Sequence, residues 1–296
     1  MPNTSLCSLL VDAHFSSFAP AFTLSQDDSE RSRKWDIPRN GGSQMHKESV
    51  VNDNNNRMET EGLLDDKNIE LWKSLISDYE IVILKEKRSD YLSYSKDKKT
   101  IIFVPYDNLN SASFAHELLH VYLRSKKVFI GSGFALSIKE NKVLSRIISE
   151  KLIEHVGNCL DHIKMYPVFI KLGYNQTEFI ADYFVDKLTN KDIEDIKNHL
   201  VEKRIFRKVY NASAIDFFIG KFFAANACPN DFFDYKKQLE KLKTIDFELF
   251  QILETFMIAW KNFDYNDTDQ ISRSYNLLLF DFIDSLENWT TGKIII

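Results

Sequence analysis

The stretch Ser113–Arg124, SFAHELLHVYLR, decides how this chain folds. Residues three and four apart share one face of an α-helix. One line along such a helix would carry the polar residues Ser113, His116, Glu117, His120 and Arg124. The other positions are almost all apolar, and a helix that is apolar on its remaining sides is buried there. We therefore predict a buried helix over about residues 111–125, with its polar line facing a cleft or a partner.

The polar line contains the motif H-E-x-x-H, which runs from His116 to His120. Its spacing places two imidazoles one turn apart, so that both can bind one Zn²⁺ at about 2.0–2.1 Å. Glu117 follows the first histidine and is placed to act as a general base towards the attacking water. The alternative is a core helix whose histidines are satisfied by hydrogen bonds. Burying three titratable groups without a ligand is costly, which favours the metal site.

A catalytic zinc needs a third protein ligand and one open position. The next helical segment, Ser149–Pro167, offers Glu154, Asp161 and His162. We predict His162 as the third ligand and keep Glu154 and Asp161 as alternatives. If His162 binds the metal, Asp161 or Asn158 is available to accept a hydrogen bond that orients an imidazole.

Two further polar residues near the motif each have two interpretations. The Tyr166 hydroxyl is a candidate to stabilise an oxyanion, although packing at the helix end is the commoner role of such a residue. Arg124 lies in the last turn, where a cation interacts favourably with the helix C-terminus. The alternative role for Arg124 is to hold a carboxylate of the substrate.

Short β-branched segments precede the motif and predict a small sheet. The expected strands are Glu80–Glu86, Tyr91–Ser95 and Thr100–Pro105, after an amphipathic helix over Asn68–Tyr79. We expect a hairpin between the last two strands and an antiparallel sheet packed on the motif helix. Thr100–Pro105 resembles an edge strand, to which a substrate peptide would add.

The rest of the chain has helical period, which makes the predicted fold class α+β with a mainly α-helical C-terminal region. FIGSGF (129–134) is interpreted as a connection, and the second helix is expected from about Asn141 to Ile163, broken or bent at Pro167. The tail TTGKIII (290–296) is a candidate last strand.

Three regions are expected along the chain. Residues 1–62 are predicted to be a disordered extension, because the polar stretch from about 26 to 60 has no apolar period. Residues 63–175 would form the catalytic core. Residues 176–296, rich in Phe and Leu, would form a helical region packed on that core.

Composition narrows the classes of function. A net charge of −5 and a pI near 5.9 give no electrostatic sign of nucleic-acid or anionic-membrane binding. The sequence contains no run of 18 consecutive apolar residues, so it does not predict a transmembrane helix. Three widely spaced cysteines do not form a disulfide framework and favour a reducing, cytoplasmic compartment. The apolar run at the N-terminus lacks a preceding positive charge, so we do not interpret it as a secretion signal.

A strand hairpin, an H-E-x-x-H helix and a second helix with a third ligand resemble the zincin metallopeptidases. The arrangement is most similar to compact intracellular members of the ImmA/IrrE type. The similarity covers about Glu80 to Tyr174, and its specific part is His116, Glu117 and His120. The longer metzincin motif is absent. The resemblance implies a peptidase with one zinc ion that hydrolyses a protein or peptide substrate.

Two other functions remain open. The chain can be a zincin-like sensor or interaction module with little or no turnover, for example in stress regulation or phage defence. It can also hold a structural zinc, which would need a fourth ligand such as Glu154 or Asp161. Glu117 favours the enzyme, because a binding module has no need of a base at that position.

Overall fold

The computed structural model describes residues 60–204, 207–227, 230, 232–266 and 271–296. The extension predicted over residues 1–62 therefore lies outside the described residues as far as residue 59. The folded region was expected to begin near Leu63, and the side chain of Leu63 is fully buried. No helix in these described ranges combines the length and apolar character that crossing a bilayer requires.

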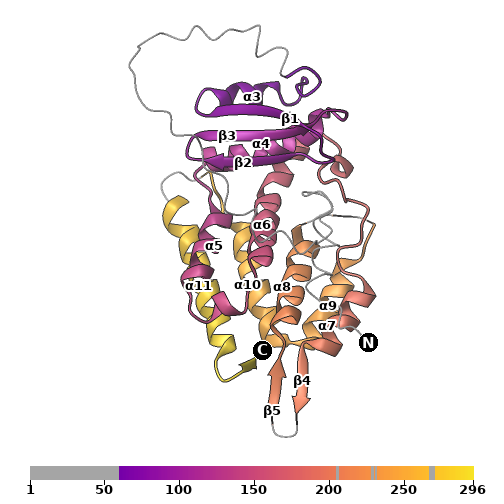
Figure 1. Cartoon of the computed structure of the whole chain (residues 1–296), viewed down its shortest axis with the longest axis vertical. Helices are drawn as coiled ribbons and strands as arrows, with labels where there is room; N and C mark the ends of the chain where they lie inside the picture. Colours follow the sequence, from indigo (N-terminus) through magenta and orange to yellow (C-terminus); the bar gives the residue numbers. More distant parts are fainter. Residues whose placement is uncertain (1–59, 205–206, 228–229, 231, 267–270) are drawn as a thin grey trace.

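The N-terminal sheet lies at one end of the elongated molecule and has the strand order β1-β3-β2 (Figure 1). Its strands are β1 (Glu80–Glu86), β2 (Leu92–Lys96) and β3 (Lys99–Pro105). The predicted hairpin is confirmed, because β2 and β3 pair antiparallel. The prediction of a wholly antiparallel sheet is wrong, since β1 pairs parallel with β3. The chain crosses from one edge to the other after β1, so β3 returns between the two earlier strands.

Strand β3 takes the middle of the sheet because it is the most continuously apolar of the three. Ile102 and Val104 are fully buried in the core below it. The prediction that Thr100–Pro105 is an edge strand is therefore wrong. The edge beside the motif helix belongs to β2, which exposes Leu92 and Tyr94.

The motif helix α4 spans Ser111–Ser125, in agreement with the predicted bounds. Asn110 caps its N-terminus, because its side-chain oxygen accepts a hydrogen bond from the backbone N–H of Ser113 at 2.8 Å. One side of α4 packs with the sheet and with α3 (Ile69–Ile76) through Phe114, Leu118 and Val121. The opposite side packs into the helical core through Ala115, Leu119 and Leu123. Only the polar line is left for chemistry, as the sequence predicts.

Helix α6 (Glu150–Lys171) carries the predicted third ligand and runs through Pro167 as one helix. It begins at Glu150, later than predicted, and α5 (Ile130–Glu140) and a short 3-10 helix (Leu144–Arg146) precede it. The prediction of a connection at FIGSGF is thus wrong for Ile130–Phe134. The glycines there are helical because α5 packs closely on α6: a Cβ built on Gly131 would lie 3.2 Å from the Cα of Gly157.

We expect Gly157→Ala to lower the free energy of unfolding by about 1–3 kcal/mol, because the added Cβ would lie 2.9 Å from the Gly131 Cα, where only backbone movement gives room. This cost exceeds the roughly 1 kcal/mol that alanine contributes through helix propensity. The control is Gly133→Ala, whose Cβ meets only the flexible end of Leu279 at 2.9 Å. Urea unfolding of both variants is the measurement, and equal midpoints would contradict a tight α5–α6 contact.

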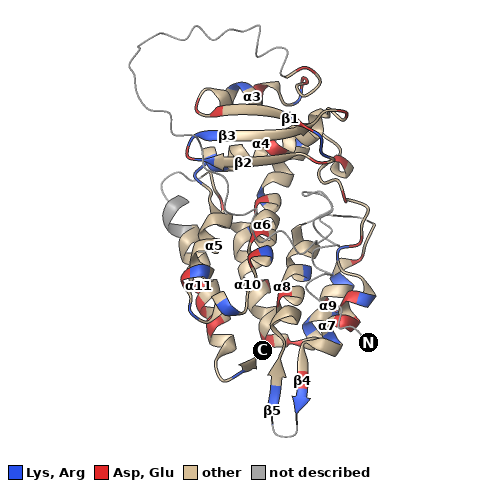
Figure 2. Cartoon of the chain, in the orientation of Figure 1, with Lys and Arg blue, Asp and Glu red and all other residues tan. Residues whose placement is uncertain are grey.

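The C-terminal region is a helical layer below the sheet (Figure 1). Its helices are a 3-10 helix (Gln176–Glu178), α7 (Asn190–His199), α8 (Ala212–Ala227), α9 (Tyr235–Ile245), α10 (Phe247–Asn262) and α11 (Ile271–Thr290). A second small sheet, which the sequence analysis missed, contains β4 (Val201–Arg204), β5 (Arg207–Tyr210) and the expected last strand β6 (Ile294–Ile295). The α+β class is confirmed. Acidic and basic residues are mixed along most elements, whereas the β4–β5 hairpin carries mainly basic ones (Figure 2).

Candidate metal centre

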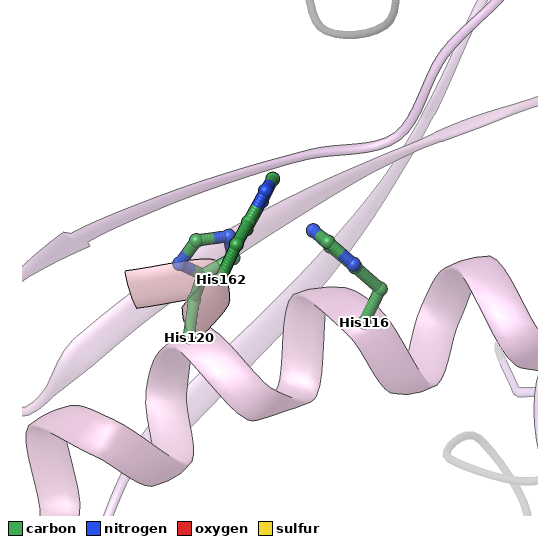
Figure 3. Close-up of side chains that lie close together, drawn as sticks. All are labelled: His116, His120 and His162. Atoms are coloured by element: carbon green, nitrogen blue, oxygen red, sulfur yellow. The ribbon is translucent and has the colours of Figure 1, made fainter. Parts of the chain in front are cut away.

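Three histidines from two helices converge beneath the sheet (Figure 3). His116 and His120 rise from the same face of α4, and His162 approaches them from α6. One ring nitrogen from each lies within 4.8 Å of the others. The ring centroids are 4.8 Å apart for His116 and His162, and 5.3 Å apart for His116 and His120. These three side chains lie close enough to bind one metal ion.

The structure places His162 in the cluster of three histidines. The two alternative ligands, Glu154 and Asp161, lie outside this group of ligand atoms. Glu154 is exposed two turns earlier on α6. Asp161 is directed to an imidazole instead of joining the three nitrogens. Within the described ranges no fourth histidine, cysteine or carboxylate completes the group. Three imidazoles suit zinc, copper, iron or nickel, and three ligands with one open position are typical of catalytic zinc.

Burial keeps two of the imidazoles neutral. Desolvation lowers the pKa of both His116 and His162 well below the ordinary value, and the neighbouring histidines lower both further. A neutral imidazole presents the lone pair that a metal requires. For His120, burial also opposes the charged form. The hydrogen bond with Asp161 and the charges of Glu117 and Asp161 outweigh burial and raise the pKa of His120.

Asp161 orients the second motif histidine. Its Oδ2 lies 3.2 Å from Nδ1 of His120, and both side chains are largely buried. A carboxylate on one ring nitrogen places the proton there and leaves the other nitrogen for a metal. This is the orienting role that the sequence analysis assigned to Asp161 or Asn158.

Removing this carboxylate should weaken metal binding without removing a ligand. We expect Asp161→Asn to raise the dissociation constant for zinc by about 10–100-fold, the usual effect of losing a carboxylate that orients a zinc-bound histidine. Competition with a chromophoric chelator measures the constant. Asn158→Ala, one turn earlier on α6, is the control and should leave it within about threefold, because the hydrogen-bond partner of His120 in the described part of the chain is Asp161 and not Asn158. An unchanged constant in Asp161→Asn would show that His120 needs no such partner.

Phe179 forms an aromatic wall behind the histidines, and nothing in its sequence context indicated this role. Its ring centroid lies 4.9 Å from that of His116 and 5.3 Å from that of His162. Its backbone also forms a hydrogen bond with His116 that favours the protonated ring. Tyr166 packs against the same ring at 5.3 Å and directs its hydroxyl to Gln176 at 3.2 Å. The packing interpretation of Tyr166 is therefore the one that its contacts support.

Glu117 lies beneath strand β2 and is only 2% exposed. Burial raises the pKa of its carboxyl, while hydrogen bonds with Ser93 of β2 and the charges of His120 and Arg88 oppose this rise. A carboxylate with a raised pKa is a stronger base and holds a proton more readily near neutral pH. The local environment of Glu117 thus suits a group that accepts and then releases a proton.

A cavity of about 600 Å³ opens beside Glu117 and His120. Its walls come from β2, from the second half of α4, from the segment 128–135 and from the first half of α6. The cavity also reaches Arg124, one helical turn beyond His120. A ligand that enters it would contact the edge strand, the general-base candidate and one metal-ligand candidate together.

The start of α6 is anchored by a buried carboxylate. Asp216 of α8 accepts the backbone N–H of Ser149 at 3.1 Å and is 2% exposed. Ser149 itself caps the helix by accepting the N–H of Leu152. Desolvation by burial raises the pKa of Asp216 to about 6.

This raised pKa makes stability depend on pH with a definite sign. The folded chain retains the proton of Asp216 up to about pH 6, whereas the unfolded chain releases it near 3.8. The contribution of Asp216 to folding is therefore most favourable below pH 4 and is lost as the pH rises through 6. About two pKa units correspond to about 3 kcal/mol.

We expect the free energy of unfolding of Asp216→Asn, relative to that of the natural chain, to rise by up to about 3 kcal/mol between pH 4.5 and 7.5. The amide oxygen of the variant still accepts the hydrogen bond from Ser149 but carries no charge. Urea unfolding of metal-free protein at both pH values gives the difference in free energy of unfolding. Asp216→Ala, which removes the acceptor, should be less stable at both. A difference for Asp216→Asn that is the same at pH 4.5 and 7.5 would contradict the raised pKa.

Comparison with known proteins adds no assignment to this geometry: no family model, no curated protein and no solved structure matches the chain.

Proposed function

We propose that this chain is a zinc-dependent peptidase, in which His116, His120 and His162 hold one zinc ion and Glu117 is the general base. The observation that carries the proposal is the convergence of three imidazole nitrogens within 4.8 Å, together with the buried carboxylate of Glu117, which lines a cavity with His120. A zinc ion bound there would polarise the scissile carbonyl and lower the pKa of the attacking water.

Residues of the chain transfer the proton and orient the metal-ligand candidates in the proposed hydrolysis. Glu117 accepts the proton of the water as its oxygen attacks the carbonyl carbon, and transfers that proton to the leaving amine as the C–N bond breaks. Asp161 keeps the His120 ring in one orientation through the 3.2 Å contact. Burial of the site beneath β2 strengthens these electrostatic interactions.

Strand β2 supports a peptide as the substrate. It lies at an edge of the sheet, its residues 92–95 line the cavity, and Ser93 contacts Glu117. An extended peptide that pairs with an exposed strand edge gains main-chain hydrogen bonds. The substrate would thus bind along β2, and not along Thr100–Pro105. From the spacing of the cysteines we place the protein in the cytoplasm.

The test is zinc-dependent hydrolysis by the purified full chain. Metal analysis should find about one zinc per chain, the number that three imidazoles and one open position accommodate. Unfolded casein should be cleaved, cleavage should stop when the zinc is removed with 1,10-phenanthroline, and it should return when zinc is added back. A fully zinc-loaded chain that cleaves neither casein nor a random peptide library would favour a sensor or a structural zinc site.

A further inference from the structure

One cationic side chain that lines the cavity, that of Arg124, has no part in the proposed hydrolysis. Arg124 lies four residues after His120 on α4, and four residues rise about 6 Å along a helix. It lines the same cavity as Glu117 and His120. An extended peptide advances about 3.3 Å per residue, so a peptide lying along α4 covers the distance from His120 to Arg124 in about two residues.

Arg124 makes no ion pair or side-chain hydrogen bond with any residue that the structure describes. Its guanidinium carbon lies 5.7 Å from the centroid of the Phe129 ring, and its side chain is half-buried. Contact with an aromatic face leaves the N–H groups at the edge of the guanidinium available for a bidentate carboxylate. The helix-end interpretation is weaker, because among the described residues no hydrogen bond joins its side chain to the last carbonyls of α4.

The other charges around the cavity do not neutralise Arg124. Asp161 is held by His120, and Glu117 faces the metal-ligand candidates below β2. Glu154 is exposed to solvent and forms no ion pair with Arg124. A charge in solvent is strongly screened, whereas a half-buried guanidinium attracts a ligand charge in a lower dielectric. The net preference of this end of the cavity is therefore for an anion.

We propose that Arg124 selects a substrate peptide that carries a carboxylate about two residues from the scissile bond. This inference rests on the proposed peptidase function, and it names the class of substrate. The carboxylate belongs to an Asp or Glu side chain or to the C-terminus of a short peptide. Two N–H groups donate to its two oxygens, while the apolar Phe129 ring shields the pair.

The test uses a random decapeptide library in two forms, with free and with amidated C-termini, and the zinc-loaded full chain. Peptides with Asp or Glu within three residues of the cut should be enriched among the products. Arg124→Gln should lower kcat/KM for such peptides by about 10–100-fold, mainly through KM, as loss of a charged hydrogen bond does. Arg124→Glu should shift the enrichment to Lys and Arg. Loss of the preference on amidation alone would assign the carboxylate to the C-terminus.

Lys126→Gln is the matched control. Lys126 is a cation two residues further on that packs over Tyr122 at 5.4 Å and does not line the cavity. This variant should keep the natural preference. An absence of acidic enrichment, or an enrichment that survives in Arg124→Gln, would overturn the inference.

A second measurement separates this inference from the peptidase proposal. The same library is passed over immobilised natural chain and over Arg124→Glu, and the retained peptides are sequenced. If no form of the chain cleaves anything but acidic peptides are retained by the natural chain alone, the peptidase proposal fails and the carboxylate site stands. If both forms retain the same peptides, the role of Arg124 is disproved, whether or not cleavage occurs.

Discussion

Glu117→Gln should abolish peptide hydrolysis while leaving the metal in place. A positioned general base contributes about 10²–10⁴-fold to a rate, so kcat on a casein-derived peptide should fall within or beyond that range. Glutamine has nearly the same shape but cannot accept the proton of the attacking water. Because Glu117 is not one of the three converging ligands, zinc content should stay near one per chain.

The measurement pairs peptide-cleavage kinetics with metal analysis of the same preparation. Glu70→Gln is the control, since Glu70 is an exposed carboxylate on α3 that forms an ion pair with Lys73. It should behave as the natural chain in both assays. If Glu117→Gln cleaves at the natural rate, Glu117 is not the base and the peptidase mechanism proposed here is wrong. If it loses zinc, Glu117 acts as a ligand instead.

His162→Ala should remove zinc from the chain. Structural zinc sites bind with about 10–16 kcal/mol shared among four ligands, so loss of one imidazole should raise the dissociation constant by about 100-fold or more. The physical reason is that His116 and His120 alone leave two positions to water. Activity at limiting zinc should fall in proportion to occupancy, and excess zinc should restore part of it.

Glu154→Ala is the matched control for this variant. Glu154 lies on the same helix as His162, two turns earlier, and its side chain is exposed and outside the histidine cluster. The zinc affinity of Glu154→Ala should equal that of the natural chain. The reverse pattern, with zinc lost in Glu154→Ala and retained in His162→Ala, would move the third ligand to Glu154. Circular dichroism of both variants checks that α6 is intact.

The local spacing of the sequence determined one helix and the pair of histidines on it. An α-helix brings residues four apart onto one face whatever surrounds it, so His116 and His120 with Glu117 between them follow from backbone geometry alone. The apolar residues around the line predicted burial on both sides, and the two cores confirm it. The helix bounds and the β2–β3 hairpin were predictable for the same reason, because both depend on contacts between near neighbours.

The meeting of His162 with the two motif histidines depended on the tertiary structure. Glu154, Asn158 and His162 repeat every four residues and share one face of α6, so helical phase does not distinguish them. The point along α6 at which α4 crosses it decides which of these side chains meets His116 and His120. That point follows from packing between segments about 40 residues apart. Close approach of Gly131 to Gly157 brings α5 against α6 and helps set this packing.

Long-range contacts also decided what the sequence analysis missed or predicted wrongly. Strand β3 lies in the middle of the sheet because its apolar residues are buried there, and β2 is left as the edge beside the site. Phe179 reaches the histidines from a segment with no motif of its own. Spacing along the chain thus determined which groups share one helix face. Only packing, which depends on the volume and shape of residues far apart in sequence, determined which other groups meet them.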